Sequence, residues 1–269
     1  MQKKFALATA LAVAFAAVPA MALPTADEIM STYMEKSGIK ANGGKIKNRV
    51  TKGTFSLPDM GMSGPTEIYV QPPNMYNKIV FDAFGEVKRG VTGDTVWSLD
   101  PMQGARIVEG EEADGQKRQA GFDQFANWKT DYAKVEVAEE ADLEGTKAFK
   151  VVFTPKEGAA TTIFFAKDSG LPVRMEQQTP DGMTGATLLS DYKAVDGIQL
   201  AHKLRIEGGQ MTFEMVYESI QHNTDIPAGT FDLPEEIKAL KNPPAPAAAP
   251  KADAPKADAT KPADTPKKP

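Results

Sequence analysis

Hydrophobic residues recur at every second position along most of the chain, which is the spacing of β-strands with one covered face. In the clearest run, Met211, Phe213, Met215 and Tyr217 share one face, while the other face is mostly polar. Further runs of this kind occupy residues 47–57, 76–81, 95–99, 146–154, 173–178 and 200–205. The pattern predicts roughly ten to twelve strands.

Turn-forming residues separate these runs at short intervals. They tolerate positive φ angles and lie between apolar stretches, as in tight hairpins. These turn sequences are Gly93-Asp94, Asp168-Ser169-Gly170, Asp181-Gly182, Asp196-Gly197 and Gly208-Gly209. We therefore predict antiparallel pairing between neighbouring strands.

A helix is predicted to precede the strands. The Thr25 side chain can cap the backbone N–H of Glu28 while the Glu28 side chain reaches back to Thr25, and Gly38 can end the helix. The apolar stripe of this helix consists of Ile29, Met30, Tyr33 and Met34.

A second helix is predicted for residues 111–128, because Phe122 and Phe125 recur at helical spacing. Gly115 and Gly121 weaken this helix and could act as hinges of a movable lid. Two helices are too few to cover both faces of one long meandering sheet. The sheet should therefore curl, so that the helices close its apolar side. The predicted fold class is mainly β: an open, strongly curved antiparallel sheet, or half-barrel, lidded by helices.

The two ends of the chain differ from its centre. Lys3 and Lys4 precede an apolar stretch, and Ala20-Met21-Ala22 is the small-x-small pattern that signal peptidase reads. From residue 243 the chain is rich in Pro, Ala and Lys, so ordering it would cost entropy that no burial offsets. We predict a signal peptide over residues 1–22, cleaved after Ala22, one domain over 23–242, a disordered tail over 243–269, and a periplasmic location.

Composition excludes several kinds of site and partner. The chain has no cysteine, which excludes disulfides, thiolate metal sites and a lipidated cysteine anchor. The formal net charge is −5, and the tail holds five lysines against three aspartates, so the central domain is more acidic than the whole chain. An acidic domain lacks the basic surface that phosphate backbones attract, so no nucleic acid is expected as a partner.

Motifs for catalysis and metal binding are missing from the sequence. His202 shares a face with Leu204 and Ile206, which is typical of a hydrogen-bonded core histidine and not of a metal ligand. No serine lies in a G-x-S-x-G elbow, and no phosphate-binding glycine motif occurs. Met60 and Met62 alone offer too few soft ligands for copper. We therefore expect no enzyme activity and no cofactor.

The apolar residues are the better candidates for a site. The chain contains 12 methionines and 13 phenylalanines, and methionine adapts to ligands of variable shape such as acyl chains. Any single one of them could equally be an ordinary core residue. The candidate residues for binding a hydrophobic ligand are Phe55, Phe81, Phe84, Trp97, Phe122, Phe125 and Phe213.

Four short segments, taken in order, resemble the outer-membrane lipoprotein-sorting carriers of the LolA/LolB-like superfamily. They are IYVQPPN at 68–74, GDTVW at 93–97 followed by Asp100-Pro101, FTPK at 153–156 and FDLP at 231–234. The predicted N-terminal helix before the first strand also fits. The resemblance implies an open, curved antiparallel sheet lidded by helices, which agrees with the fold predicted from periodicity.

The resemblance also implies a ligand and partners. The ligand would be the acyl moiety of a lipoprotein or another lipid, held by a monomer and handed on without chemistry between inner- and outer-membrane transport components. Trp97 is the first residue that the resemblance implies as part of the ligand-binding site. Pro72 stands where the best-known carriers have an arginine implicated in ligand transfer.

The predicted function is therefore a periplasmic carrier that binds acyl chains of lipoproteins, or other hydrophobic ligands, in an apolar cavity for delivery to the outer membrane. The main alternative is an envelope-stress sensor or regulatory protein-binding module on the same fold, because a fold does not by itself determine a function. An enzyme that uses acidic groups of the cleft and a purely structural envelope protein are further alternatives.

Overall fold

The computed structural model describes residues 22–83, 85–123, 125, 127–156, 158–178, 183–208 and 211–242. Residues 1–21 of the predicted signal peptide, the predicted tail, Phe84 and the predicted turn at Asp181-Gly182 lie outside the described residues.

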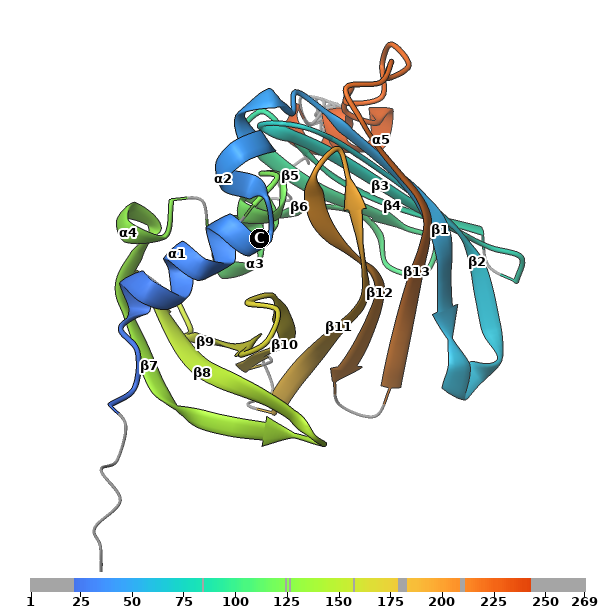
Figure 1. The fold of residues 1–269 in the computed structure, drawn as a ribbon. Coiled ribbons are helices and arrows are strands. Elements are labelled where there is room, and N and C mark those ends of the chain that lie inside the picture. Colours follow the sequence, from blue (N-terminus) through green and yellow to red (C-terminus); the bar gives the residue numbers. More distant parts are fainter. Residues whose placement is uncertain are drawn as a thin grey trace, which may run out of the picture.

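One antiparallel sheet of 13 strands makes up most of the described chain (Figure 1). Its strand order is β6-β5-β4-β3-β2-β1-β13-β12-β11-β10-β9-β8-β7. The strands are β1 (Arg49–Leu57), β2 (Met62–Gln71), β3 (Asn74–Phe81), β4 (Gly85–Thr92), β5 (Thr95–Asp100), β6 (Gly104–Val108), β7 (Tyr132–Leu143), β8 (Thr146–Pro155), β9 (Thr161–Ala166), β10 (Pro172–Gln178), β11 (Thr184–Val195), β12 (Ile198–Gly208) and β13 (Met211–His222). β6 and β7 lie at opposite edges, so the sheet is curved but open, as predicted, with one strand more than expected.

Short turns of the predicted kind join neighbouring strands. Asp196 and Gly197, with φ angles of 49° and 77°, link β11 to β12, which is the positive-φ geometry of a two-residue hairpin turn. Gly93, with φ of 56°, lies between β4 and β5 in the same way. These turns account for the antiparallel pairing of the strands that follow each other in sequence.

The helices are short and the first is capped as predicted. They are α1 (Ala26–Lys36), α2 (Ile39–Asn42), α3 (Gly110–Gln119), α4 (Trp128–Asp131) and α5 (Glu235–Lys241), with 3₁₀ turns η1 (Gly43–Lys45) and η2 (Pro58–Met60). The backbone N–H of Glu28 donates to Thr25 Oγ1 at 3.3 Å, and the Thr25 N–H donates to Glu28 Oε2 at 2.7 Å. Gly38 follows α1 with φ of 77°, so it ends the helix as expected.

The predicted helix over residues 111–128 is wrong in its extent. α3 ends at Gln119, and Trp128 begins the separate helix α4. Between them, Asp123 Oδ1 accepts hydrogen bonds from the Phe125 N–H at 2.9 Å and from the Tyr33 hydroxyl at 3.1 Å. The Asp123 side chain therefore accepts hydrogen bonds from a nearby backbone N–H and from a distant hydroxyl. Both hydrogen bonds favour a loop over a continuous helix at this point.

The connection between β6 and β7 joins opposite edges of the sheet and crosses its concave side, where residues of α3 and Phe125 face the strands. It carries α3, and both α1 and α3 lie on the inner side of the curve in Figure 1, whereas α5 lies outside it. No helix of the described residues is long and apolar enough to cross a membrane.

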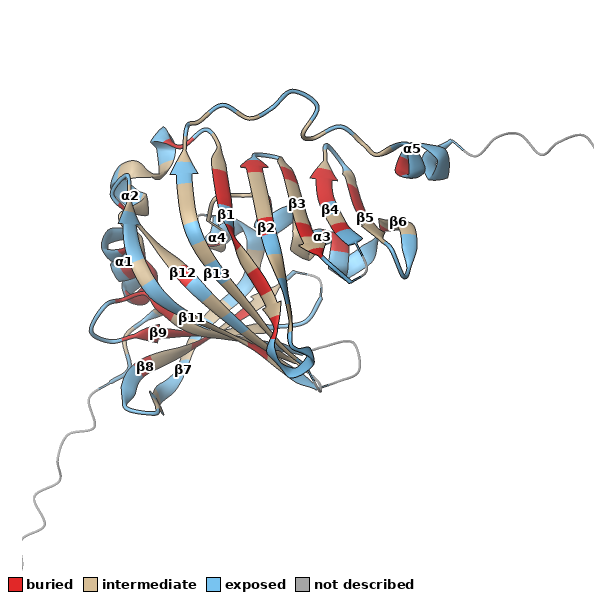
Figure 2. Ribbon diagram, turned by 90° about the vertical axis from the view of Figure 1, so that its right-hand side faces the viewer, coloured by how far each residue is buried: buried red, intermediate tan, exposed pale blue. Residues whose placement is uncertain are grey.

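Strand register assigns each side chain to the concave or the convex face. Directly paired residues share a face, and neighbours in a strand point to opposite faces. Val91 pairs with Met75 and with Val96, and these three residues form one buried cluster with Ala113 of α3. That row therefore faces inward, and buried positions recur along these strands in Figure 2.

Candidate functional site

A cavity of about 640 Å³ lies on the concave side, between α3 and strands β7 to β13. This volume is within the range of cavities that bind small ligands. Its large apolar lining residues include Phe125, Ile163, Met175, Ile206 and Phe213. The cavity is therefore bordered by the curved sheet on one side and by the connection between β6 and β7 on the other, and it is open to solvent.

A single row of paired residues runs across five strands at this cavity. Ile163 pairs with Met175, which pairs with Thr187; Thr187 pairs with Ile206, which pairs with Phe213. All five residues line the cavity. The floor of the cavity is thus set by strand register, since each strand contributes its inward-facing residue at the same level.

An aromatic cluster closes one side of the cavity. The rings of Tyr33 and Phe125 meet edge to face at a centroid distance of 5.7 Å, and Phe125 lies 5.2 Å from Phe153. Tyr33 belongs to α1 and Phe153 to β8, so Phe125 joins the helix to the sheet. Phe125 is 3% exposed although it follows a bend and not a helix.

Two of the predicted ligand-binding residues, Phe125 and Phe213, line the cavity. Phe55 and Phe81 form a buried group beside it: the Phe55 ring lies 5.6 Å from Phe81 and 5.8 Å from Phe213. They extend the apolar surface beyond Phe213 without lining the cavity. Phe84 lies outside the described residues.

Phe122 lies over the guanidinium group of Arg49, 5.5 Å from its carbon, and packs against the cluster under α3. It does not line the cavity either. Phe122 and Phe125 are three residues apart in the connection between β6 and β7, but Phe122 packs on Arg49 and Phe125 lines the cavity.

Trp97 lies on the opposite, convex face. Its neighbour Val96 belongs to the inward-facing cluster, and Trp97 pairs with Gly90, which leaves room for the indole. Trp97 Nε1 donates to Thr92 Oγ1 at 3.2 Å, and the Thr92 hydroxyl donates to the carbonyl of Phe231 at 2.9 Å. With 1% exposure, Trp97 anchors the C-terminal segment and is not part of the cavity wall.

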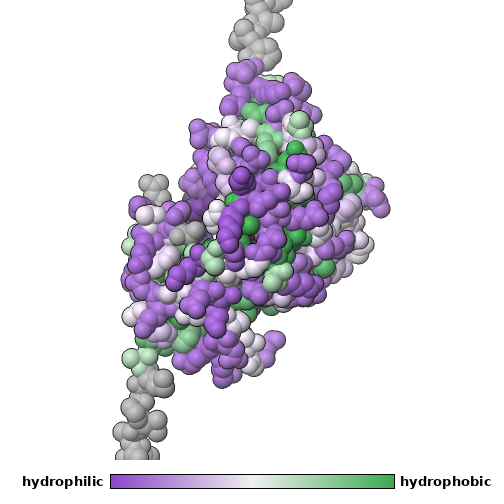
Figure 3. Space-filling view, turned by 45° about the horizontal axis from the view of Figure 1, so that its top comes forward, coloured by the Kyte–Doolittle hydropathy of each residue, from purple (hydrophilic) through white to green (hydrophobic). Residues whose placement is uncertain are grey.

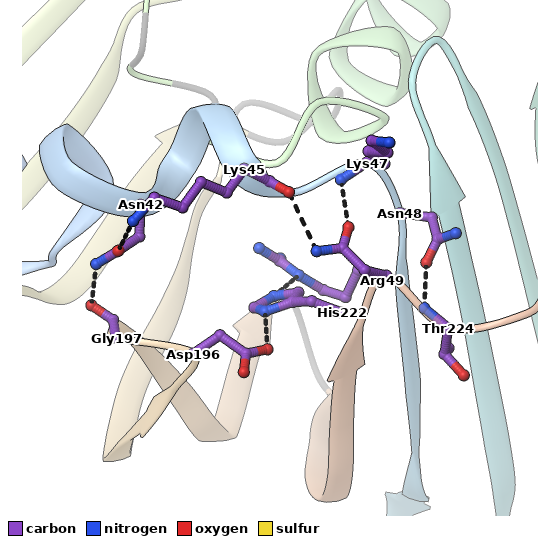
Figure 4. Close-up of polar contacts among 10 residues, drawn as sticks. Asn42, Lys45, Lys47, Asn48, Arg49, Asp196, Gly197, His222 and Thr224 are labelled. Atoms are coloured by element: carbon purple, nitrogen blue, oxygen red, sulfur yellow. Dashed lines mark hydrogen bonds and ion pairs between the residues drawn. The ribbon is translucent and has the colours of Figure 1, made fainter.

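A polar network lies on the concave side at the other end of β1 and β13 (Figure 4). Arg49 Nε donates to His222 Nε2 at 3.2 Å, so His222 Nδ1 carries the ring hydrogen and donates to Asp196 Oδ2 at 3.1 Å. Burial and the charge of Arg49 lower the pKa of His222. The network joins the start of β1, the end of β13 and the turn between β11 and β12.

Asp123 and Tyr217 add to the polar character of this end. Burial raises the pKa of Asp123, and its Oδ2 is buried without a hydrogen-bond partner among the described residues. Burial also raises the pKa of Tyr217 to about 12. The sheet surface thus changes from apolar at Phe213 to polar at Tyr217 along a single strand.

The two histidines differ from each other in role. His202 is 5% exposed and its Nδ1 lies 2.9 Å from the Leu200 carbonyl oxygen, as expected for a hydrogen-bonded core histidine. The part of the chain that the structure describes brings no three His, Cys, Asp or Glu residues together for a metal ion.

Reasoning from the sequence missed most of the cavity floor. Ile163, Met175, Thr187 and Ile206 are single inward positions on separate strands, so no local motif groups them. The hairpin turns and the alternation of apolar residues were the available signal, because together they determine which residues pair.

No family model and no curated protein sequence matches the chain. A LolA superfamily protein from Nitrosomonas europaea matches with a TM-score of 0.54 and 13% identity, over 78% of this chain and 99% of that chain.

Two further solved structures match to a similar extent. A DUF1329 family protein from Desulfovibrio piger has a TM-score of 0.52 and 14% identity, over 77% of this chain and 96% of that chain. A putative outer membrane lipoprotein-sorting protein domain from Vibrio parahaemolyticus has a TM-score of 0.50 and 11% identity, over 76% and 95%. The chain therefore has a LolA-like fold, and the resemblance seen in the sequence is confirmed at that level.

Proposed function

We propose that this protein is a periplasmic carrier that holds the acyl chain of a lipoprotein, or a similar hydrophobic ligand, and delivers it to the outer membrane. The observation that carries the proposal is the row from Ile163 to Phe213, which forms the floor of a cavity of about 640 Å³ on the concave side of a LolA-like sheet. The predicted signal peptide supports the periplasmic location.

Burial of a hydrocarbon chain would supply the affinity. Each methylene that leaves water contributes about 0.8 kcal/mol, so even part of one acyl chain adds several kcal/mol. Hydrophilic residues predominate on the face shown in Figure 3, so the cavity offers such a chain a more apolar environment than this outer surface. Binding of this kind needs no catalytic group.

Exchange of the ligand requires the cover to move. The connection between β6 and β7 covers the cavity with α3 and Phe125, and it is held to α1 by the hydrogen bond between Asp123 and Tyr33. We therefore place the movable lid in this connection, between residues 109 and 131.

The test is lipid extraction and native mass spectrometry of the mature protein purified from its own periplasm. In a Thr187→Trp variant the added indole occupies the cavity floor, so co-purifying lipid or acylated polypeptide should be lost. Leu188→Trp is the matched control, because Leu188 is the next residue of β11 and pairs with Arg205 on the convex face.

Retention of ligand by Thr187→Trp would contradict the assignment of the cavity. A wild-type protein free of lipid that recovers one stoichiometric protein partner would contradict the carrier function and favour the regulatory alternative. The control must keep its ligand for either result to count.

A further inference from the structure

We propose that the ligand of this cavity carries an anionic head group, as a long-chain carboxylate does, and that Arg118 of α3 receives it. The inference rests on the proposed carrier function and adds the chemical class of the ligand.

The charged residues of the cavity wall do not balance. They are Arg118, Glu176 and Glu207, and the two glutamates adjoin the floor residues Met175 and Ile206, so their side chains point to the convex face. Glu176 is paired with Arg174, whose Nε lies 2.6 Å from Oε1, and Glu207 is paired with Arg205 at 2.9 Å. Arg118 makes no ion pair and no side-chain hydrogen bond with any residue of the described ranges. Among the described residues, the wall therefore presents one positive charge without an ion-pair partner, on the exposed side chain of Arg118.

The arginines of the chain also fall into two groups, those with and those without an ion pair to a described residue. There are six. Within the described residues, Arg106, Arg174 and Arg205 form ion pairs. The other three are Arg49, Arg89 and Arg118, which form none with a described residue.

The three arginines without an ion pair to a described residue share the concave side. Arg49 pairs in register with Val70, and Arg89 pairs with Asn77 and Ser98, which places both on the inward face. Arg118 lines the cavity on the side formed by α3. Asp123 lies near Arg49 and Glu112 near Arg89, so within the described ranges Arg118 is the arginine of the concave side for which no nearby carboxylate is recorded.

A guanidinium group beside an apolar cavity is suited to an amphiphile with an acidic end. Arginine presents donors in a planar fork that matches carboxylate and phosphate oxygens. The acyl chain would lie along the row from Ile163 to Phe213, with its acidic end at the C-terminal turn of α3. A carboxylate and a phosphate monoester share this chemistry, so the experiment includes both.

The experiment measures displacement of the neutral probe N-phenyl-1-naphthylamine from the mature protein. The competitors share a palmitoyl chain: palmitate, its methyl ester, lysophosphatidate and monoacylglycerol. We expect palmitate to bind about fivefold more tightly than its ester, as for a partly exposed charge-assisted contact. Arg118→Gln should bring this ratio to about one and leave the affinity for the ester unchanged.

Lys117→Gln is the matched control, since Lys117 is the preceding residue of α3 and lines a different hollow of about 440 Å³, next to Lys241. It should keep the wild-type ratio. If lysophosphatidate shows the larger preference over monoacylglycerol, the head group is a phosphate; if palmitate over its ester does, it is a carboxylate.

Equal affinity of the wild type for charged and neutral competitors, or a ratio unchanged by Arg118→Gln, would overturn the inference and leave the carrier function standing. Failure of the probe and of every competitor to bind would overturn the carrier function itself. The two failures are therefore distinguishable within one experiment.

Discussion

Each face of the sheet carries a large aromatic residue, but the packing around that residue differs between the two faces. On the convex face, Trp97 fits against Gly90 and is sealed by the C-terminal segment through Thr92 and Phe231. On the concave face, Phe213 ends a row that borders a cavity, because the cover there stands away from the sheet. Tight contact produces a core on one face, and a gap of the right size produces a candidate binding site on the other.

The largest effect is expected from Trp97→Ala. A fully buried indole is replaced by a methyl group, so the free energy of unfolding should fall by about 3–5 kcal/mol. Chemical denaturation measures the loss. Under conditions where the variant is folded, its affinity for an acyl probe should equal that of the wild type; a lost affinity would contradict the placement of Trp97 outside the site.

Gly90→Ala tests how closely the convex face is packed. A Cβ atom at Gly90 would lie 2.7 Å from Trp97 Cζ2 and 2.8 Å from the Met75 carbonyl oxygen. We expect a loss of about 1–3 kcal/mol in the free energy of unfolding. Gly115→Ala is the concave-side comparison: the nearest atom to its Cβ, Nη2 of Arg118, would be 3.9 Å away, and in a helix this change should raise the free energy of unfolding by about 0.5–1 kcal/mol. Equal effects of the two changes would remove the contrast between the faces.

Phe213→Ala should affect stability less than Trp97→Ala does. Phe213 is only half-buried and already borders a hollow, so the loss should be about 2 kcal/mol or less. The affinity for an acyl probe should fall, because the variant removes part of the cavity floor. Denaturation and probe titration on the same sample separate the two effects, and an unchanged affinity would exclude Phe213 from the site.

The smallest effect concerns the polar end of the concave side. Because burial and Arg49 lower the pKa of His222, the unfolded chain takes up a proton at a higher pH than the folded protein. The contribution of His222 to stability is therefore complete above the unfolded pKa of about 6.5 and is lost as the pH falls through that value towards the folded pKa. Denaturation at pH 8, 7, 6 and 5 should show this loss in the wild type and a flatter profile in His222→Asn.

Much of the local structure was predictable from the residues. The cap at Thr25, the turn at Asp196 and the shared face of Phe213 and Met215 follow from short-range stereochemistry, which neighbouring residues decide. The extent of α3 was not predictable in this way. The loop after α3 is held by Asp123, which accepts a hydrogen bond from the hydroxyl of Tyr33, a residue distant in sequence.

The sequence by itself determined which residues alternate in strands and where the chain turns back, because period and turn chemistry are properties of adjacent residues. Only the tertiary structure decided that Val96 faces the inside of the curve and Trp97 the outside. Alternation divides a strand into two faces without saying which one is concave. That choice depends on the connection between β6 and β7, which must cross one side of the sheet to join its two edges and thereby covers the cavity.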